Sequence, residues 1–517
     1  MRPRTPGLKT LAILVGHLWL LPAMAADAPA APAASVPAPE SSLVGQSVVK
    51  VFSTVREPDL LKPWGKQAPV EISGSGVVIE GNRILTNAHV VLYATQVQIQ
   101  GHQAGDKLSA TVEAISPGID LAVLKLDDPS FFKTHPPLPR ADKLPNVTDS
   151  VLTYGYPIGG TSLSITKGIV SRIEFTIYTF PVSGLKIQVD SAINAGNSGG
   201  PVVADDQMIG LAFSRLVGNA QNIGYIIPNE EIELFLKQVA EGHVVGKPGL
   251  YDGFQTLENP ALRAFLRIDP SAQGLVVSQP YPGDPSNPLK QWDVVTAIGD
   301  TPVDDQGMIK IGGDLRVDFR YRVQQIARNG KVPLTVVRAG KTLQLQVPVS
   351  PDRSLLIANL HGDYPPYFIY GPLVFSRLTQ NYANAVVQNA QQAANLAYFR
   401  SPLIIDRGLQ PTPERDELVV ISSPFFPDAL AKGYSQANGG VVRSINDVPV
   451  RDLKHLVALL RDLKDEYVVV KFDSENAETL VFRRAELVAQ TEHILDDNGV
   501  RAQGSPELMA VWQGKAK

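Results

Sequence analysis

Short apolar runs rich in β-branched residues recur along the chain, and glycine, proline, asparagine and aspartate separate them. Runs of about four to eight such residues between turn residues are typical of β-strands. Residues 83–91 (RILTNAHVV) predict a strand that ends at the histidine, and residues 119–125 (IDLAVLK) predict a strand that opens at the aspartate. We therefore expect a mainly β protein.

Helical spacing of apolar residues is clear in only a few segments. Residues 229–241 carry apolar side chains three and four positions apart, which predicts a short amphipathic helix. Residues 452–460 also predict a helix, and the Asn-, Gln- and Ala-rich residues 380–397 predict an inserted helix. Residues 491–517 are weakly patterned, so we expect this tail to be partly disordered.

One pattern of short strands and a turn occurs twice in the second half of the chain. Residues 441–450 (VVRSINDVPV) repeat the strand and turn of residues 295–303. A chain of 517 residues is also too long for one ordinary core. We therefore expect several domains, of which two are related to each other.

Composition narrows the possible chemistry. The chain is 44% hydrophobic and 19% charged, as expected of a globular protein. A net charge of −4 gives no electrostatic reason to expect a nucleic acid partner. Cysteine is absent, which excludes disulfides, thiolate metal sites and a cysteine nucleophile. The few histidines are scattered, so we expect neither a metal nor another cofactor.

The N-terminus predicts export. Three basic residues precede the apolar residues 11–21, and Ala23 and Ala25 provide small side chains two positions apart. This arrangement is typical of a cleavable signal peptide, here residues 1–25, and the apolar run is shorter than a spanning helix requires. The Ala- and Pro-rich residues 26–42 predict a linker. We expect a periplasmic protein.

Residues 196–201 (GNSGGP) place Ser198 in a tight turn flanked by glycines. A serine nucleophile needs backbone N–H donors that already point at the developing oxyanion, and glycine permits the backbone conformations that this requires. Gly196 and Ser198 are the candidate donors. Taken alone, the same residues are equally typical of an ordinary turn.

His89 and Asp120 favour the interpretation of Ser198 as a nucleophile over that of an ordinary turn. A catalytic triad needs a histidine that takes the proton of the serine, and an acid that orients and stabilises the imidazole. A single histidine at a strand end is more often structural, and a single aspartate before an apolar run is more often a turn residue. Together with Ser198, they predict a His-Asp-Ser triad.

The residues around these three positions resemble the active-site blocks of the Deg/HtrA family of trypsin-like serine proteases. The matching blocks are residues 86–91 (TNAHVV), 120–125 (DLAVLK) and 196–201 (GNSGGP), and residues 73–78 (SGSGVV) resemble the preceding strand. The resemblance implies that residues 43–242 form a protease domain of two six-stranded antiparallel β-barrels with the triad in the cleft between them. It also implies a homo-oligomer, either a trimer or a larger assembly, in which residues 159–165 and 176–184 are regulatory loops.

Both later domains resemble PDZ domains, which are α+β modules. Residues 248–350 are similar to a first PDZ domain of the Deg/HtrA type, and residues 353–490 resemble the divergent second PDZ domain of plant-type Deg proteases, followed by the tail 491–517. The resemblance implies that the first domain binds C-terminal peptides through a loop formed by Leu250, Tyr251, Asp252, Gly253 and Phe254. Asp252 departs from that pattern, because a carboxylate there repels a peptide terminus unless it points away. A packing role without peptide binding remains open.

The specificity pocket is predicted from the position six residues before Ser198, which is Ala192. Trypsin-type enzymes carry an acid there, and this chain has none to pair with Lys or Arg. Leu211, Ala212 and Phe213 are predicted to form the other wall. We therefore expect cleavage after small or medium aliphatic residues.

The resemblance implies an ATP-independent serine endopeptidase that degrades unfolded or damaged exported proteins. A chaperone or adaptor with PDZ domains and little proteolytic activity remains the alternative. An esterase of the α/β-hydrolase fold is excluded by chain order, because those enzymes place the serine first and the histidine last.

Overall fold

The computed structural model describes residues 43–102, 104–160, 162–179, 181–215, 223–313, 315–435, 437–475 and 477–515. The predicted signal peptide and the linker before residue 43 lie outside this part of the chain. Within it, no helix is long and apolar enough to cross a membrane.

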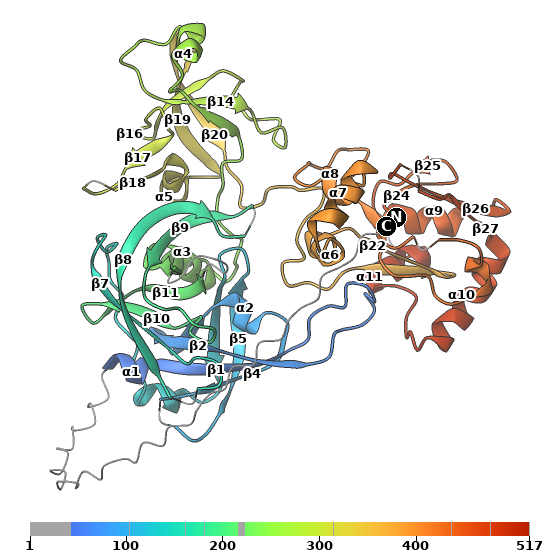
Figure 1. Cartoon of the computed structure of the whole chain (residues 1–517), viewed down its shortest axis with the longest axis horizontal. Helices are drawn as coiled ribbons and strands as arrows, with labels where there is room; N and C mark the ends of the chain where they lie inside the picture. Colours follow the sequence, from blue (N-terminus) through green and yellow to red (C-terminus); the bar gives the residue numbers. More distant parts are fainter. Residues whose placement is uncertain are drawn as a thin grey trace, which may run out of the picture. The chain divides into compact units, whose positions relative to one another are not determined.

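Six antiparallel strands form a first closed barrel in the order β1-β2-β3-β6-β5-β4 (Figure 1). A short helix, α1 (Leu43–Ser47), leads into it, and a 3₁₀ helix, η1 (Pro129–Lys133), follows it. The barrel interior is filled by branched side chains, among them Val51, Ile84 and Leu124. The strands are β1 (Val48–Val55), β2 (Val70–Ile79), β3 (Arg83–Thr86), β4 (Ala94–Gln100), β5 (Leu108–Ser116) and β6 (Leu121–Leu126).

Six further strands form a second closed barrel in the order β10-β11-β12-β9-β8-β7. The predicted helix after it is present as α3 (Asn229–Ala240). This pair of six-stranded antiparallel barrels confirms the predicted fold class of the protease region. The strands are β7 (Ser150–Gly155), β8 (Ser164–Ile177), β9 (Ser183–Val189), β10 (Pro201–Ala204), β11 (Gln207–Arg215) and β12 (Gly224–Pro228).

The next region contains one sheet in the order β13-β14-β15-β19-β20, with β16 paired to β15, and a separate hairpin of β17 and β18. Its strands are β13 (Gly253–Thr256), β14 (Leu275–Gln279), β15 (Val294–Ile298), β16 (Thr301–Pro302), β17 (Met308–Lys310), β18 (Arg316–Asp318), β19 (Lys331–Arg338) and β20 (Lys341–Pro348). Its helices are α4 (Pro260–Leu266), η2 (Phe319–Arg322) and α5 (Val323–Ile326).

The C-terminal region contains two sheets, β21-β22-β23 and β25-β24-β26-β27. Their strands are β21 (Tyr367–Tyr370), β22 (Leu373–Arg377), β23 (Val419–Ile421), β24 (Val442–Ile445), β25 (Val448–Pro449), β26 (Tyr467–Phe472) and β27 (Leu480–Arg483). The helices before the last strands are α6 (Gln380–Val386), α7 (Ala390–Tyr398), α8 (Pro402–Ile405), η3 (Ala429–Ala431) and α9 (Leu453–Asp462). The repeated strand and turn and the helix after it are thus present as β24, β25 and α9.

Two expectations for this region were wrong. The single helix expected over residues 380–397 is two helices, because the Asn389 side chain accepts a hydrogen bond from the Gln392 N–H and starts α7 anew. The tail expected to be partly disordered forms α10 (Arg484–Asp497) and α11 (Pro506–Trp512). Leu508 and Val511 on α11 are buried in the core of this region. Two well-placed apolar residues are enough to anchor a short helix, although they leave little pattern in the sequence.

Candidate active site

His89 lies on the helical turn α2 (Ala88–Val91), and not at the end of a strand as expected. Adjacent residues of a strand point to opposite faces. Here Val90 and Val91 are both about 3% exposed and both pack into the core of the first barrel, which a helical turn allows. The turn leaves the His89 side chain half-exposed at the edge of the barrel.

Both oxygens of the Asp120 carboxylate bind His89. The backbone N–H of His89 donates to Oδ1 at 2.8 Å, and the ring Nδ1 lies 2.7 Å from Oδ2. Burial lowers the pKa of His89, but the hydrogen bond and negative charge of Asp120 outweigh it, so the net pKa is raised above its ordinary value. The pair therefore fixes the tautomer with Nδ1 protonated and leaves Nε2 as the basic atom.

Asp120 immediately precedes β6 and has a left-handed backbone conformation, with φ of 58°. Its carbonyl accepts a hydrogen bond of 2.9 Å from the fully buried Asn87 side chain. Asn87 precedes α2 and does not cap it with its side chain. The amide instead joins the segment that carries His89 to the segment that carries Asp120, a role that sequence reasoning did not assign.

The carbonyl groups of residues 195–198 are all held by hydrogen bonds. The Ala195 carbonyl accepts from the Ile158 N–H at 2.9 Å, and the Asn197 carbonyl accepts from the Gly200 N–H at 2.9 Å. Those of Gly196 and Ser198 accept from Ser75, at 2.8 Å each. By contrast, neither the Gly196 N–H nor the Ser198 N–H donates to any residue that the structure describes. These are the two groups predicted as oxyanion donors.

Two glycines are required by this loop. Gly196 has a φ of 99°, and a Cβ there would lie 2.4 Å from the Tyr156 carbonyl oxygen. Gly199 has a φ of 85°, and a Cβ there would lie 2.1 Å from the Ser75 carbonyl oxygen. Both positions therefore exclude side chains through conformation and through space.

Ser198 lies at the centre of this loop and is partly exposed. Within the described part of the chain, its hydroxyl makes no hydrogen bond, so it is not bonded to His89. Hydrogen bonds between nucleophile and base are often long before substrate binds. The structure thus pairs His89 with Asp120 and leaves the Ser198 hydroxyl available.

The predicted specificity residues do not share one wall. Ala212 on β11 faces the interior of the second barrel, in the same cluster as Ile193. Leu211 and Phe213 face the opposite side, where Phe213 packs on Tyr178 with 5.2 Å between ring centroids. Neighbours in a strand alternate in direction, which explains the split.

Ile193 is a pocket candidate that the sequence analysis missed. It is next to Ala192 and is 6% exposed. It packs closely on Gly224: a Cβ added to Gly224 would lie 2.6 Å from Ile193 Cδ1. Its position between a predicted pocket residue and a predicted catalytic loop was the signal that could have identified it.

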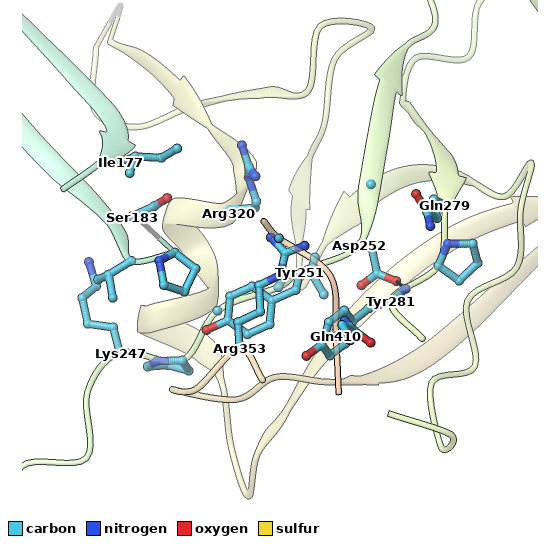
Figure 2. Close-up of a pocket in the computed structure, with 18 of the residues that line it drawn as sticks. Ile177, Ser183, Lys247, Tyr251, Asp252, Gln279, Tyr281, Arg320, Arg353 and Gln410 are labelled. Carbon is cyan, nitrogen blue, oxygen red and sulfur yellow. Dashed lines mark hydrogen bonds between the residues drawn. The ribbon is translucent and has the colours of Figure 1, made fainter. Parts of the chain in front are cut away.

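Asp252 in the predicted peptide-binding loop is held by two hydrogen bonds. Its Oδ1 accepts hydrogen bonds from the Tyr281 N–H at 2.8 Å and from the Asn287 side chain at 2.7 Å. Figure 2 shows Asp252 beside Tyr281. Burial raises the pKa of the Asp252 carboxyl, whereas these two hydrogen bonds act to lower it. Burial outweighs them, so the net pKa of Asp252 is raised above its ordinary value.

A cavity of about 690 Å³ lies beside this loop and is lined by residues 250–253. Lys247, Arg320 and Arg353 also line it. Lys247 is paired with Glu231, and Arg320 with Asp318. Arg353 lies over the Tyr251 ring, with 6.0 Å between its Cζ and the ring centroid.

β13 in the first PDZ-like region and β22 in the second differ in whether they have an unpaired edge. β13 is the end strand of its sheet and pairs only with β14 among the strands described. β22 lies between β21 and β23, so both of its edges are taken. Addition of a peptide strand requires an unpaired edge. β13 offers such an edge, and β22 does not.

A buried ion pair lies at the end of the second barrel. Lys247 Nζ is 2.5 Å from Glu231 Oε2, and the two side chains are 6% and 0% exposed. The other oxygen of Glu231 accepts a hydrogen bond of 2.7 Å from the Leu185 N–H on β9. The segment after α3 is thereby tied to the barrel.

The described residues contain no group of three or more His, Cys, Asp or Glu side chains placed to hold a metal ion.

Known proteins match both halves of the chain. The trypsin-like peptidase domain family matches residues 74–211, and the PDZ domain family matches residues 358–507. Protease Do-like 2, chloroplastic, of Arabidopsis thaliana is 34% identical over 471 residues, covering 90% of this chain and 76% of that protein. Protease Do-like 4, mitochondrial, of the same organism is also 34% identical over 471 residues, covering 90% and 86%.

A solved structure described as HtrA-type protease AlgW with tripeptide is 25% identical and has a TM-score of 0.48. The match covers 60% of this chain and 96% of that one.

Proposed function

Because this chain belongs to the Deg/HtrA family of trypsin-like serine proteases, we propose that it is an ATP-independent endopeptidase that degrades unfolded or damaged exported proteins. One observation carries the proposal: the His89 and Asp120 side chains are paired at 2.7 Å, in a domain whose Ser198 loop has two unused N–H groups. A buried N–H without a partner is rare unless it has a functional role.

The proposed mechanism is acyl transfer. His89 Nε2 takes the proton of the Ser198 hydroxyl as Ser198 Oγ bonds to the scissile carbonyl carbon, and the N–H groups of Gly196 and Ser198 hold the resulting oxyanion. His89 then gives the proton to the leaving nitrogen as the C–N bond breaks. Water then attacks the carbonyl of the acyl-enzyme while His89 Nε2 takes its proton. His89 gives that proton to Ser198 Oγ as the bond between Oγ and the acyl carbon breaks. Asp120 stabilises the imidazolium each time it forms.

Cleavage after small or medium aliphatic residues is proposed from the pocket. The absence of an acid at Ala192 gives a basic side chain no partner. The contact between Ile193 and Gly224 supports an apolar pocket of limited depth.

Peptide binding is proposed for the first PDZ-like region and not for the second. The open edge of β13 and the hydrogen bonds that hold the Asp252 carboxylate support the former. The paired edges of β22 support an assembly or packing role for the latter.

Export and homo-oligomeric assembly are also part of the proposal. Export follows from the pattern of residues 1–25, and assembly follows from the family. The mass of the mature N-terminus tests the first point, with Ala26 expected as the first residue. Light scattering of the purified protein tests the second.

The proposed activity is tested by incubating unfolded casein and a folded protein with the purified enzyme and with its Ser198→Ala variant, without ATP. We expect the wild type alone to degrade casein and to spare the folded protein. If the wild type and Ser198→Ala both bind casein and neither cleaves it, the chaperone alternative would be favoured instead.

A further inference from the structure

Ser75 is a polar residue on β2 of the first barrel and is 0% exposed. Its side chain and backbone make four hydrogen bonds. Its hydroxyl donates to the Gly196 carbonyl at 2.8 Å and accepts from the Tyr156 N–H at 2.8 Å. A serine hydroxyl has only one hydrogen to donate, and here it is committed to Gly196.

The backbone of Ser75 binds the same region. Its N–H donates to the Ser198 carbonyl at 2.8 Å, and its carbonyl accepts from Thr86 Oγ1 at 2.7 Å. Thr86 lies three residues before His89. One buried residue of the first barrel is thus bonded to the loop of Ser198 in the second barrel and to the strand that leads to His89.

Fixing these carbonyl groups also fixes the direction of the N–H groups. The C=O and N–H of a trans peptide point in opposite directions. The Ala195 carbonyl faces the Ile158 N–H, so the N–H of Gly196 faces away from Ile158. On the other side of Gly196, its carbonyl accepts from the Ser75 hydroxyl, its one partner among the described residues. The N–H of the same peptide group, on Asn197, donates to the Asn194 carbonyl at 2.9 Å, so this peptide group is held at both ends.

We propose that Ser75 is the positioning residue of the oxyanion loop: its hydroxyl and N–H hold the Gly196 and Ser198 carbonyls, and so fix the peptide group between the two that carry the donor N–H groups and the one that follows them. The proposal rests on the proposed proteolysis. Ser75 does not touch substrate, because it is fully buried. Without the hydroxyl, the buried Gly196 carbonyl and Tyr156 N–H lose their partners, and such groups rotate to find new ones. Glycine at residue 196 makes this rotation easy.

The test compares Ser75→Ala with wild type and with Ser73→Ala. Ser73 lies on the same face of β2, two residues away, and its hydroxyl makes no hydrogen bond with the described residues. Steady-state cleavage of a peptide is measured together with inhibition by a peptide boronic acid, which binds as an analogue of the tetrahedral intermediate. Loss of one oxyanion donor lowers kcat by about 10²-fold to 10³-fold in a well-studied serine protease.

For Ser75→Ala, we expect kcat to fall by about 10²-fold with KM within about twofold of wild type, and the boronate Ki to rise in parallel. Ser73→Ala should resemble wild type. A loss confined to KM, or an unchanged boronate Ki, would overturn the proposal. If Ser75→Ala does not fold, Ser75→Cys, which keeps a weak donor of similar size, should have an intermediate kcat; a wild-type kcat for it would also count against the proposal.

A crystal structure of Ser75→Ala separates this proposal from the proposed proteolysis. A rotated peptide at Gly196 supports the positioning role even if no substrate is found for the wild type. An unchanged loop overturns it, whatever the activity of the enzyme.

Discussion

The backbone and the ring of His89 bind different oxygens of the same Asp120 carboxylate, at 2.8 Å and 2.7 Å. Two contacts fix both the position of the imidazole and its orientation, which a single hydrogen bond to the ring does not. The Asp120 side chain is only 18% exposed, so solvent screens the interaction weakly. The charge of Asp120 therefore raises the pKa of His89.

The pH dependence of cleavage should report that coupling. A protonated His89 cannot accept the proton of Ser198, so kcat/KM should fall as pH drops through the raised pKa of His89, which lies above its ordinary value of about 6.5. Asp120→Asn should move this transition to lower pH and reduce kcat by about 10⁴-fold. Peptide cleavage between pH 5 and pH 9 measures both. An unshifted transition in the variant would contradict the assigned role of Asp120.

Gly199→Ala should abolish activity. The added Cβ would lie 2.1 Å from the Ser75 carbonyl oxygen and 2.5 Å from Thr86 Oγ1, at a residue with φ of 85°. The loop must move to relieve this contact. Gly105→Ala is the matched control, because nothing lies within 4 Å of a Cβ there. Casein cleavage and melting temperature should be unchanged in the control, and a fully active Gly199→Ala would show that the loop is not rigid.

Ile193→Ala should widen the specificity pocket, because it removes the side chain that packs on Gly224. We expect the preference to move from Val and Ala toward Leu and Phe. Leu211→Ala should instead leave the preference unchanged and destabilise the domain by about 2–5 kcal/mol, since Leu211 is fully buried on the opposite face of β11. Sequencing of cut sites in a peptide library distinguishes the two variants. Altered preference in Leu211→Ala alone would place the pocket on the other face.

The pair of six-stranded barrels in the protease region was predictable through resemblance, because the blocks around His89, Asp120 and Ser198 are short and contiguous. The helical turn at His89 was not, since its cause is the shared burial of Val90 and Val91 in one core. The same limit applies to Ser75. Both of its sequence neighbours are glycines, and its role depends on Gly196, which lies 121 positions away in the chain.

Outside the protease region, the sequence predicted the repeated strand and turn because local pattern specified it. It did not predict the direction of the Asp252 side chain, which depends on Tyr281 and Asn287. The sequence also did not predict that the C-terminal tail is helical. Burial of Leu508 and Val511 depends on a core built by β21 and α9, so the tail alone carries too little pattern.

Lys247→Met should destabilise the protein by about 3–5 kcal/mol, because it leaves the charge of Glu231 buried without a partner. The double variant with Glu231→Gln should recover part of this loss, since a Gln side chain oxygen can still accept from the Leu185 N–H. Calorimetric unfolding measures each variant. Arg483→Met removes one partner of an exposed pair and is the control, with an expected loss of about 0–1 kcal/mol. Equal losses for Lys247→Met and Arg483→Met would argue against a buried ion pair.

The most direct test of the account is covalent trapping of the nucleophile. The purified protein is treated with a peptide phosphonate, and the modified residue is located by mass spectrometry in the wild type, His89→Ala and Ser198→Ala. The account predicts one adduct, on Ser198, in the wild type only, with both variants folded. An adduct on another residue, or labelling of Ser198 that survives loss of His89, would contradict the proposed triad.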